Sequence, residues 1–241
     1  RGNKVLSEKN DVVLEWNNGK GLIFKKTIKL DEKYLFKIKQ EVKNNTSSKI
    51  NLYPYSQITR NKKPDDVMGF YILHEGFIGV FDGELKEDDY DDIKDKKIVR
   101  NSDNGWLGIT DKYWVTAIVP PKDKNFKSTF LYKDNFRANY ILNSPVTINP
   151  KSTSGNEVRL FVAAKEVETV DGYAESENIE KFDLTIDWGW FYFFTKPLFF
   201  VIDYLFKLSG NFGIAIVLIT LAIRIIFFPL ANYSFRSMAK M

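Results

Sequence analysis

The stretch Phe212–Leu230, FGIAIVLITLAIRIIFFPL, constrains this chain more than any other part of its sequence. It holds 19 residues and only one charged side chain, Arg224. As an α-helix it would be roughly 28 Å long, about the thickness of the hydrocarbon core of a bilayer. A helix pairs its own backbone polar groups and is therefore stable in lipid. The sequence predicts a membrane-spanning helix here.

Arg224 is the anomaly of this predicted span. A guanidinium at the centre of a membrane helix costs roughly 2.5–3.5 kcal/mol on insertion scales, so such a charge needs an explanation. Thr220 lies one turn earlier on the same helix face, and apolar residues continue for almost two turns after Arg224. This polar face favours a neighbouring helix or a hydrated cavity. The alternative, that Arg224 reaches the lipid headgroups along its own alkyl chain, stays open.

The composition excludes several kinds of chemistry. The chain of 241 residues has no cysteine, which rules out disulfides and thiol catalysis. Its one histidine, His74, argues against a histidine-based metal site or a Ser-His-Asp triad. We therefore expect no thiol-based or histidine-based site of these kinds and no metal centre. Because the chain begins at Arg1 rather than Met, we interpret it as a piece of a longer protein.

The net charge of +4 is concentrated near the predicted span. Residues from Asp187 onward carry +3, so the preceding part carries only +1 with both signs mixed, and we expect no nucleic-acid binding. Arg236 and Lys240 follow the span, which favours a cytoplasmic C-terminal side under the positive-inside rule. Lys196 and Lys207 on the other flank weaken this asymmetry. The large N-terminal part would then lie outside the cytoplasm.

Residues 11–184 have the pattern of a β protein. Tyr34–Lys43 alternates apolar and charged side chains, as expected of a strand with one face in water. Further strands are predicted at Val12–Trp16, Leu22–Leu30, Ile50–Arg60 with a break at Pro54, Phe70–His74, Phe77–Phe81, Leu107–Thr110, Tyr113–Val119, Ser128–Tyr132, Phe136–Leu142, Val146–Ile148 and Val158–Lys165. Their spacing predicts an antiparallel β-sandwich over residues 1–186. One helix is expected around Tyr173–Lys181.

The most charged stretch is Glu84–Lys97, which we interpret as a solvated loop or helix end. Its acidic side chains Asp88, Asp89, Asp91 and Asp92 could bind calcium, but the stretch lacks the glycine and terminal glutamate of an EF-hand. We expect His74 to be a strand residue with an ordinary hydrogen bond. Trp106 and Trp114 are expected in the core or a loop, with a sugar-binding platform as the alternative.

The stretch Trp188–Leu208, WGWFYFFTKPLFFVIDYLFKL, is strongly aromatic. Pro197 suits the first position of a helix and Gly210 suits its C-terminal cap, so a helix is predicted over Pro197–Leu208. Such a helix is too short to span a bilayer, and Asp203 and Lys207 form a narrow polar stripe on it. This favours a helix lying in the membrane interface, within residues 187–210, over a core helix of the β domain. The predicted interface residues are Trp188, Trp190, Phe191, Lys196, Phe199, Phe200 and Lys207.

The order of these segments resembles the YidC membrane protein insertases of Gram-negative inner membranes. The resemblance is carried by GWFYFFTKPL, an amphipathic helix, a Gly-Asn pair, an apolar span with one arginine and a proline, and SMAKM. Upstream, GWLGITDKYWVTAIVPP at Gly105–Pro121 and LFVAAKE at Leu160–Glu166 also match the family pattern. The resemblance implies a mainly β fold: a twisted periplasmic supersandwich, then an interfacial helix, a transmembrane helix over 211–231 and a cytoplasmic helical region from 232 to 241.

The resemblance also implies a function. Arg224 matches the arginine of the family's hydrophilic groove, so Arg224 and Thr220 become the candidate substrate-binding residues. The implied activity is insertion and folding of inner-membrane proteins, alone or with the Sec translocon. It involves no enzymatic chemistry, so the resemblance implies no catalytic residues and no cofactor. Nascent inner-membrane proteins and lipids would be partners, with translocon components and the ribosome contacted through missing regions. Residues 1–210 would be periplasmic. The alternatives are a membrane-anchored carbohydrate-binding or sugar-modifying domain and a structural anchor that docks on the translocon.

Overall fold

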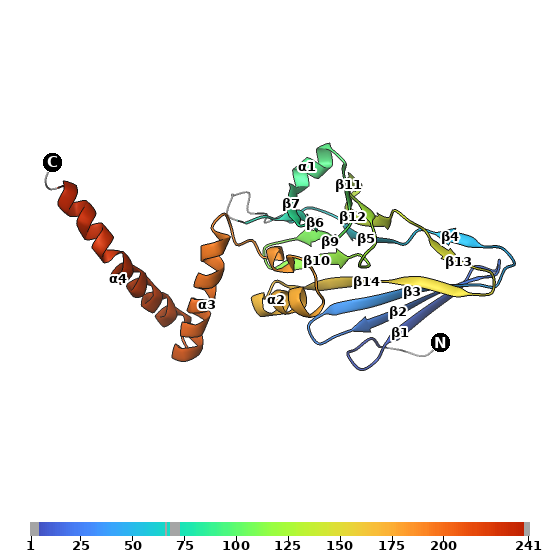
Figure 1. Cartoon of the computed structure of the whole chain (residues 1–241), viewed down its shortest axis with the longest axis horizontal. Coiled ribbons are helices and arrows are strands. Elements are labelled where there is room, and N and C mark those ends of the chain that lie inside the picture. The colour runs from blue at the N-terminus through green and yellow to red at the C-terminus, as the bar shows by residue number, and fades with distance from the viewer. Residues whose placement is uncertain (1–4, 66, 68–72, 239–241) are drawn as a thin grey trace. The chain divides into compact units, whose positions relative to one another are not determined.

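The computed structural model describes residues 5–65, 67 and 73–238 (Figure 1). The chain divides into two compact units, Arg1–Asp187 and Trp188–Met241. The first unit is built from antiparallel sheets and the second from two helices, so the predicted fold class is confirmed. The predicted division of the chain into four parts stays a prediction.

The described residues of the first unit form three antiparallel sheets. The eight-stranded sheet has the order β1-β2-β3-β14-β10-β9-β6-β7, and the four-stranded sheet has the order β5-β12-β11-β8. A third, two-stranded sheet pairs β13 with β4. The strands are β1 (Val12–Asn17), β2 (Leu22–Leu30), β3 (Leu35–Asn44), β4 (Ile50–Leu52), β5 (Tyr55–Arg60), β6 (Gly76–Phe81), β7 (Glu84–Asp89), β8 (Ile98–Ser102), β9 (Gly105–Thr110), β10 (Trp114–Val119), β11 (Phe126–Lys133), β12 (Asn135–Leu142), β13 (Val146–Ile148) and β14 (Thr153–Ala164).

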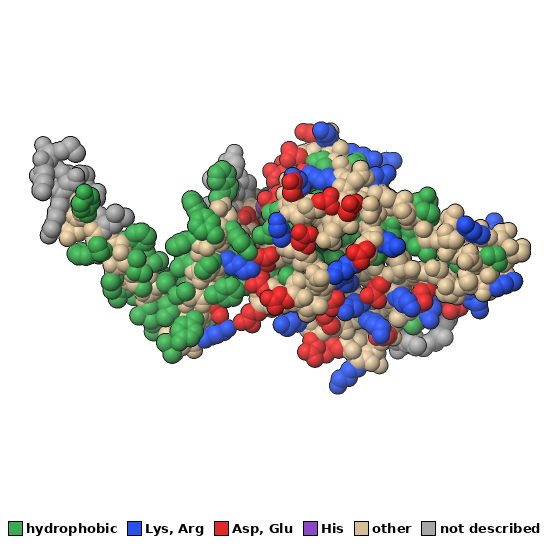
Figure 2. Space-filling view, viewed as in Figure 1, with side chains coloured by type: hydrophobic (Ala, Val, Ile, Leu, Met, Phe, Trp, Pro, Cys, Tyr) green, Lys and Arg blue, Asp and Glu red, His purple; other side chains and the backbone are tan. Residues whose placement is uncertain are grey.

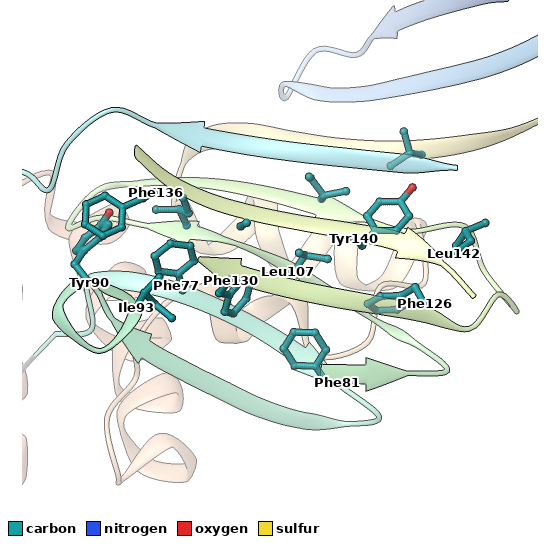
Figure 3. Packing of buried hydrophobic residues seen from close by; sticks show 14 residues of the cluster. Phe77, Phe81, Tyr90, Ile93, Leu107, Phe126, Phe130, Phe136, Tyr140 and Leu142 are labelled. Atoms are coloured by element: carbon teal, nitrogen blue, oxygen red, sulfur yellow. The ribbon is translucent and has the colours of Figure 1, made fainter. Parts of the chain in front are cut away.

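The central strands of the large sheet are covered on both faces. Every residue of β6 and of β9 is buried, which explains why GFIGVF and GWLGIT show no polar alternation. On one face they pack against the four-stranded sheet, and the resulting core is dominated by aromatic rings (Figure 3). Phe77 lies at its centre, with ring centroids 4.9 Å from Phe130 and 5.9 Å from Tyr90.

The opposite face of the large sheet is covered by α2 (Val167–Ser176) and a short 3₁₀ helix, η1 (Phe182–Thr185). Val170, Tyr173 and Phe182 pack there against the buried Trp106 and Phe161. The unit is therefore a three-layer structure whose middle layer is the centre of the large sheet. Burial on two faces is what the central strands require, because a single covered face would leave apolar side chains in water.

A hairpin turn and its hydrogen bonds to a neighbouring loop stabilise the edge of the large sheet. β6 and β7 are joined by Asp82-Gly83, and both residues have positive φ, 50° and 79°, as a two-residue type I′ turn requires. Asp82 Oδ1 accepts hydrogen bonds from the Asp103 amide at 2.8 Å and the Ser102 hydroxyl at 2.8 Å. These bonds, the Asp103 amide first, lower the pKa of Asp82 below its usual value of 3.8.

Most predicted strands are confirmed, and the break at Pro54 separates β4 from β5. The interpretation of Glu84–Lys97 as a loop or helix end was wrong for its first half. Glu84–Asp89 is β7, an edge strand whose charged side chains suit an edge exposed to water, and α1 (Tyr90–Asp95) follows it. β8 was not predicted. Within the described residues no group of three His, Asp or Glu is placed to hold a metal, and Asp88 instead pairs with Arg100 at 2.8 Å.

Two other predictions need correction. The helix expected at Tyr173–Lys181 is α2, which begins at Val167 and ends at Ser176, since Asn178 at φ 48° and Lys181 at φ 52° cannot continue a helix. Of the strand predicted at Phe70–His74, residues 70–72 lie outside the described residues. Leu73 and His74 are not in a strand. His74 does make the expected hydrogen bond, from Nε2 to the Phe77 carbonyl at 3.0 Å.

The second unit consists of α3 (Tyr192–Ser209) and α4 (Phe212–Met238). The predicted start of the first helix was wrong, because Pro197 lies inside α3 rather than at its first position. The aromatic residues before Pro197 are therefore helical too. The predicted continuation of the span into a longer helix is confirmed, since α4 runs without a break through Met238.

The aromatic core predicts a large effect of one truncation. Phe130→Ala removes a buried ring that contacts Phe77 and Phe81, and it should lower the free energy of unfolding by about 3–5 kcal/mol. Urea denaturation followed by circular dichroism measures the change. Lys127→Ala, on the same strand but exposed, is the control and should stay within about 0.5 kcal/mol. Equal effects of the two substitutions would contradict the proposed packing.

The hydrogen bonds that Asp82 accepts from Ser102 and Asp103 predict that the stability of the first unit depends on pH in acid. A carboxylate whose pKa is lowered in the folded state stabilises fully above its unfolded value of 3.8, and this contribution is lost as the pH falls through the lower, folded value. Asp82→Asn should therefore destabilise at neutral pH, and the difference from the native chain should shrink in acid. Urea midpoints measured from neutral pH down to about pH 2.5 would show this; a constant difference would contradict it.

Candidate membrane interface and groove residues

The second unit exposes an unusual amount of apolar surface (Figure 2). In α3, all of whose residues are described, no side chain is buried. In α4, Ala215 is buried, but most of the apolar side chains between Phe212 and Phe228 are exposed. A protein in water rarely leaves a patch of this size uncovered, so this surface is typical of contact with lipid or with another apolar partner.

The charges of α3 occupy one narrow stripe. Lys196, Asp203 and Lys207 are seven and four residues apart, which places them within about 40° of one another around the helix. Lys207 and Asp203 form an ion pair at 2.8 Å. The other side of the helix is aromatic and aliphatic. This arrangement is typical of helices that lie in a membrane interface, which turn a polar stripe toward water and an apolar side toward the acyl chains.

The length argument for this interpretation was wrong, although the arrangement of charges still supports it. α3 has 18 residues and is about 27 Å long, enough to cross a hydrocarbon core if length alone decided. Three charges on one side and Pro197 inside the helix distinguish it from α4. Only α4, over Phe212–Pro229, combines the length and apolar composition of a candidate span among the described helices.

The start of α3 gathers aromatic rings around a lysine. Lys196 Nζ lies 5.7 Å from the ring centroids of both Trp188 and Tyr192, within the range of a cation–π contact. The Thr195 hydroxyl donates a hydrogen bond to the Trp188 carbonyl at 2.8 Å. Trp190 is 95% exposed, and tryptophan side chains without protein contacts are typical of the headgroup region of a membrane. Tyr192 and Thr195 belong to this cluster but were not predicted.

The remaining predicted interface residues lie further along this segment. Phe191, Phe199 and Phe200 are all exposed, and the Phe199 ring lies 5.8 Å from the Trp188 ring. The structure thus brings Trp188, Lys196 and Phe199 together. Lys207 lies three turns away and pairs with Asp203 instead.

A tight turn joins α3 to α4. Gly210 has φ 66° and its amide donates to the Phe206 carbonyl at 2.8 Å, so it caps α3 as predicted. Asn211 caps α4, because its Oδ1 accepts hydrogen bonds from the amides of Gly213 at 2.9 Å and Ile214 at 3.3 Å. The rings of Phe206 and Phe212 meet edge-to-face at 6.0 Å. These contacts stabilise the abrupt change of direction between the helices.

Arg224 and Thr220 lie on consecutive turns of α4, and both side chains are exposed. The Thr220 hydroxyl donates to the Ile216 carbonyl at 2.7 Å, so its proton is used within the helix and its lone pairs face outward. The α4 sequence contains no Asp or Glu that could neutralise the guanidinium. A partner for Arg224 must therefore come from outside this helix, as water, another segment or a bound polypeptide.

A second polar group near Arg224 comes from the backbone. Pro229 lies inside α4 and has no amide hydrogen, so it cannot donate to the carbonyl of Ile225 four residues earlier. An unpaired carbonyl is costly in lipid and is tolerated in membrane helices where neighbouring groups or water satisfy it. The carbonyl of Ile225 and the guanidinium of Arg224 are adjacent in the chain. Both need polar surroundings at the same depth.

A polar network holds the point at which the chain leaves the first unit. The Asp187 carboxylate accepts a hydrogen bond from the His74 amide at 2.9 Å. Nearby, Lys165 donates to the Thr110 hydroxyl at 3.1 Å, and burial lowers the pKa of Lys165. Asp111 pairs with Arg60 and accepts from the Tyr90 hydroxyl. Sequence reasoning missed this cluster, because its members come from widely separated segments.

The structure therefore defines a class: a β-sandwich protein followed by two exposed helices, the second of which is long and apolar enough to span a membrane. The model of the YidC periplasmic domain matches residues 1–201. The membrane protein insertase YidC of Pelagibacter ubique is 52% identical over 240 residues, and that of Brucella suis is 42% identical over 247 residues. The chain belongs to the YidC family. With α4, this membership indicates an inner-membrane protein.

The matches cover the whole of this chain but only part of each relative. The chain spans 43% of the Pelagibacter ubique protein and 40% of the Brucella suis protein. Among solved structures, an α-galactosidase from Lactobacillus brevis is similar, with a TM-score of 0.48 and 11% identity, covering 68% of this chain and 25% of that one. The family match does not support the carbohydrate-binding alternative.

The stripe on α3 predicts a periodic pattern of contact with lipid. The chain has no cysteine, so single cysteines placed at successive positions from 198 to 207 can carry spin labels. In bilayer nanodiscs, oxygen accessibility should oscillate with a period of about 3.6 residues and be lowest near Asp203 and Lys207. A smooth gradient of depth along α3 would instead indicate that this helix crosses the membrane.

Proposed function

We propose that this chain is part of an insertase that helps membrane proteins enter and fold in the bacterial inner membrane, through a hydrophilic groove that includes Arg224 and Thr220. The observation that carries the proposal is the pair of polar groups on α4, the guanidinium of Arg224 and the Ile225 carbonyl, to which Pro229 has no amide hydrogen to donate. The names of the relatives support the same activity.

The depth of Arg224 explains what the groove would do. Arg224 lies 12 residues after Phe212, so it is about 18 Å along α4 and roughly 12 Å from the far side of a 30 Å hydrocarbon core. A hydrated groove that reaches Arg224 from the cytoplasm would leave less than two thirds of the apolar thickness for a polar segment to cross. The cost of moving polar groups through lipid falls accordingly.

The proposed mechanism involves no bond chemistry. Arg224 would attract acidic residues in the part of a client that must cross the membrane, and low polarity around the groove would strengthen this attraction. The contact has to be transient, because the client must leave. The apolar stretch of the client would then move sideways into lipid, driven by the burial of its own side chains.

The interfacial helix α3 would set the position of the groove. Its aromatic rings and Lys196 would hold the segment at the periplasmic surface, and the capped turn at Gly210 and Asn211 would fix where α4 enters the membrane. In this arrangement residues 1–210 are periplasmic and the C-terminal end is cytoplasmic. Sec translocon components and the ribosome would be contacted through segments that the relatives have beyond the matched region.

A substitution series at position 224 tests the groove. In the full-length protein, Arg224→Ala should reduce insertion of clients with acidic translocated tails by several-fold to about tenfold, the equivalent of about 1.4 kcal/mol. Arg224→Lys should retain most activity because it keeps the positive charge. Clients with neutral tails should be affected less. Insertion is measured by protease protection of the tail in reconstituted vesicles.

Lys127→Ala is the matched control, since it also removes one positive charge but lies at an exposed position of β11, outside α3 and α4, and insertion by it should be normal. Normal insertion of acidic-tailed clients by Arg224→Ala would contradict the groove. Cross-linking from position 224 separates the remaining alternative, a structural anchor. An insertase requires nascent chains next to Arg224, whereas an anchor would give cross-links to translocon components only.

A further inference from the structure

We propose that the first unit has its own membrane contact: two neighbouring turns, Asp31–Tyr34 and Asp111–Tyr113, together with Trp114 and Val162, rest on the lipid headgroups. This surface is called the turn patch below. The inference rests on the proposed placement of α3 in the membrane interface. It adds a lipid-binding surface on the β-sandwich, outside α3 and α4.

The turn patch exposes large aromatic side chains that the core does not use. Tyr113 is 64% exposed, Trp114 62% and Tyr34 58%, and Val162 is exposed beside them. Lys112 Nζ lies 5.1 Å from the centroid of the Tyr113 ring. Tryptophan, tyrosine and lysine together are the side chains enriched at membrane–water interfaces, where a ring can sit among headgroups and an ammonium can meet phosphate.

The sheet register brings the two turns together. Trp114 is opposite Ala164 in the β10–β14 pair, and Thr116 is opposite Val162. On the other side of β14, the Val162 amide donates to the Tyr34 carbonyl at 3.4 Å. Two strand spacings, about 10 Å, therefore separate the turns. The hairpin tip is closed by the Asp111 amide and the Trp114 carbonyl at 2.8 Å, so the rings are carried on ordered backbone.

The patch lies at the end of the unit from which the chain leaves for α3. The Lys112 amide donates to Glu75 Oε1 at 3.0 Å, and the neighbouring residue, His74, donates its amide to the Asp187 carboxylate. The Lys165 amide donates to the Tyr113 carbonyl at 2.9 Å. α3 begins five residues after Asp187, a tether of at most roughly 17 Å. If α3 lies in the interface, this end of the sandwich must lie near the membrane surface.

The charged side chains of the turn patch favour binding to lipid only modestly, so the aromatic rings must supply most of the binding. Lys33 and Lys112 are exposed in the two turns, and Glu32 is exposed beside Lys33. Asp111 is paired with Arg60. The occupant that fits is a lipid surface, because it offers an apolar layer for rings directly beneath phosphate groups.

Single-cysteine labelling tests the proposal in the complete protein. A fluorophore is attached at Lys33→Cys, and the protein is placed in nanodiscs of phosphatidylcholine and phosphatidylglycerol that contain lipids with a nitroxide in the headgroup. Quenching is expected at position 33. A fluorophore at Tyr53→Cys is the control. Tyr53 is also exposed, 54%, but it lies between β4 and β5, at the other end of the sheet from the turn patch, so no quenching is expected there.

Two substitution pairs show whether the rings are responsible. Tyr113→Ser with Trp114→Ser should abolish most of the quenching at position 33. Tyr53→Ser with Tyr55→Ser, which also removes two exposed rings, should leave it unchanged. Circular dichroism checks that both variants stay folded. Equal quenching at positions 33 and 53, or quenching at 33 only after translocon components are added, would overturn the proposal.

A label at Leu218→Cys, inside α4, separates this inference from the proposed function. Quenching of that label by lipids with a nitroxide in the acyl chain, with no quenching at position 33, would reject the turn patch and leave the membrane placement of α4 intact. Absence of quenching at both positions would reject both.

Discussion

The second unit depends on the cost of leaving a polar group without a partner in hydrocarbon. Within α4, hydrogen bonds between turns satisfy the backbone, and even the Thr220 hydroxyl bonds the carbonyl of Ile216. Two groups are not served in this way, the guanidinium of Arg224 and the Ile225 carbonyl, to which Pro229 has no amide hydrogen to donate. They are adjacent in the chain, and on this adjacency rests the proposal that water or another polar segment reaches them. The proposed groove would supply partners to these two groups, whereas hydrogen bonds within the helix satisfy the rest of α4.

A different constraint acts on the first unit: its central strands are apolar on both faces, and both faces must be buried. The four-stranded sheet covers one face of β6 and β9, and α2 with η1 covers the other. Both helical elements lie between β14 and Asp187, so the segment that completes the core also leads the chain out of the domain. The hydrogen bond from His74 to Asp187 fixes this exit. The chain therefore leaves the sandwich at one particular end, the end that carries the turn patch.

The two units differ in how directly their sequences specify them. The strand β3 was evident because its sequence alternates apolar and charged side chains, whereas β7 was missed because an edge strand can carry ELKEDD without loss. α2 was misplaced although Val167, Val170 and Tyr173 have helical spacing, since its apolar face is only three residues long. The early start of α3 was missed because proline is more frequent at a first helical position than inside a helix.

The sequence alone determined the β class of the first unit, the apolar span of α4 and the singular position of Arg224, because each depends on local periodicity or on a transfer cost that acts residue by residue. Only the tertiary structure decided which residues meet across the sheets. Asp88 with Arg100, Asp187 with His74, and the turns carrying Tyr34 and Tyr113 are separated in the chain. Strand order and register bring them together, and these are properties of the whole sheet that a single segment does not contain.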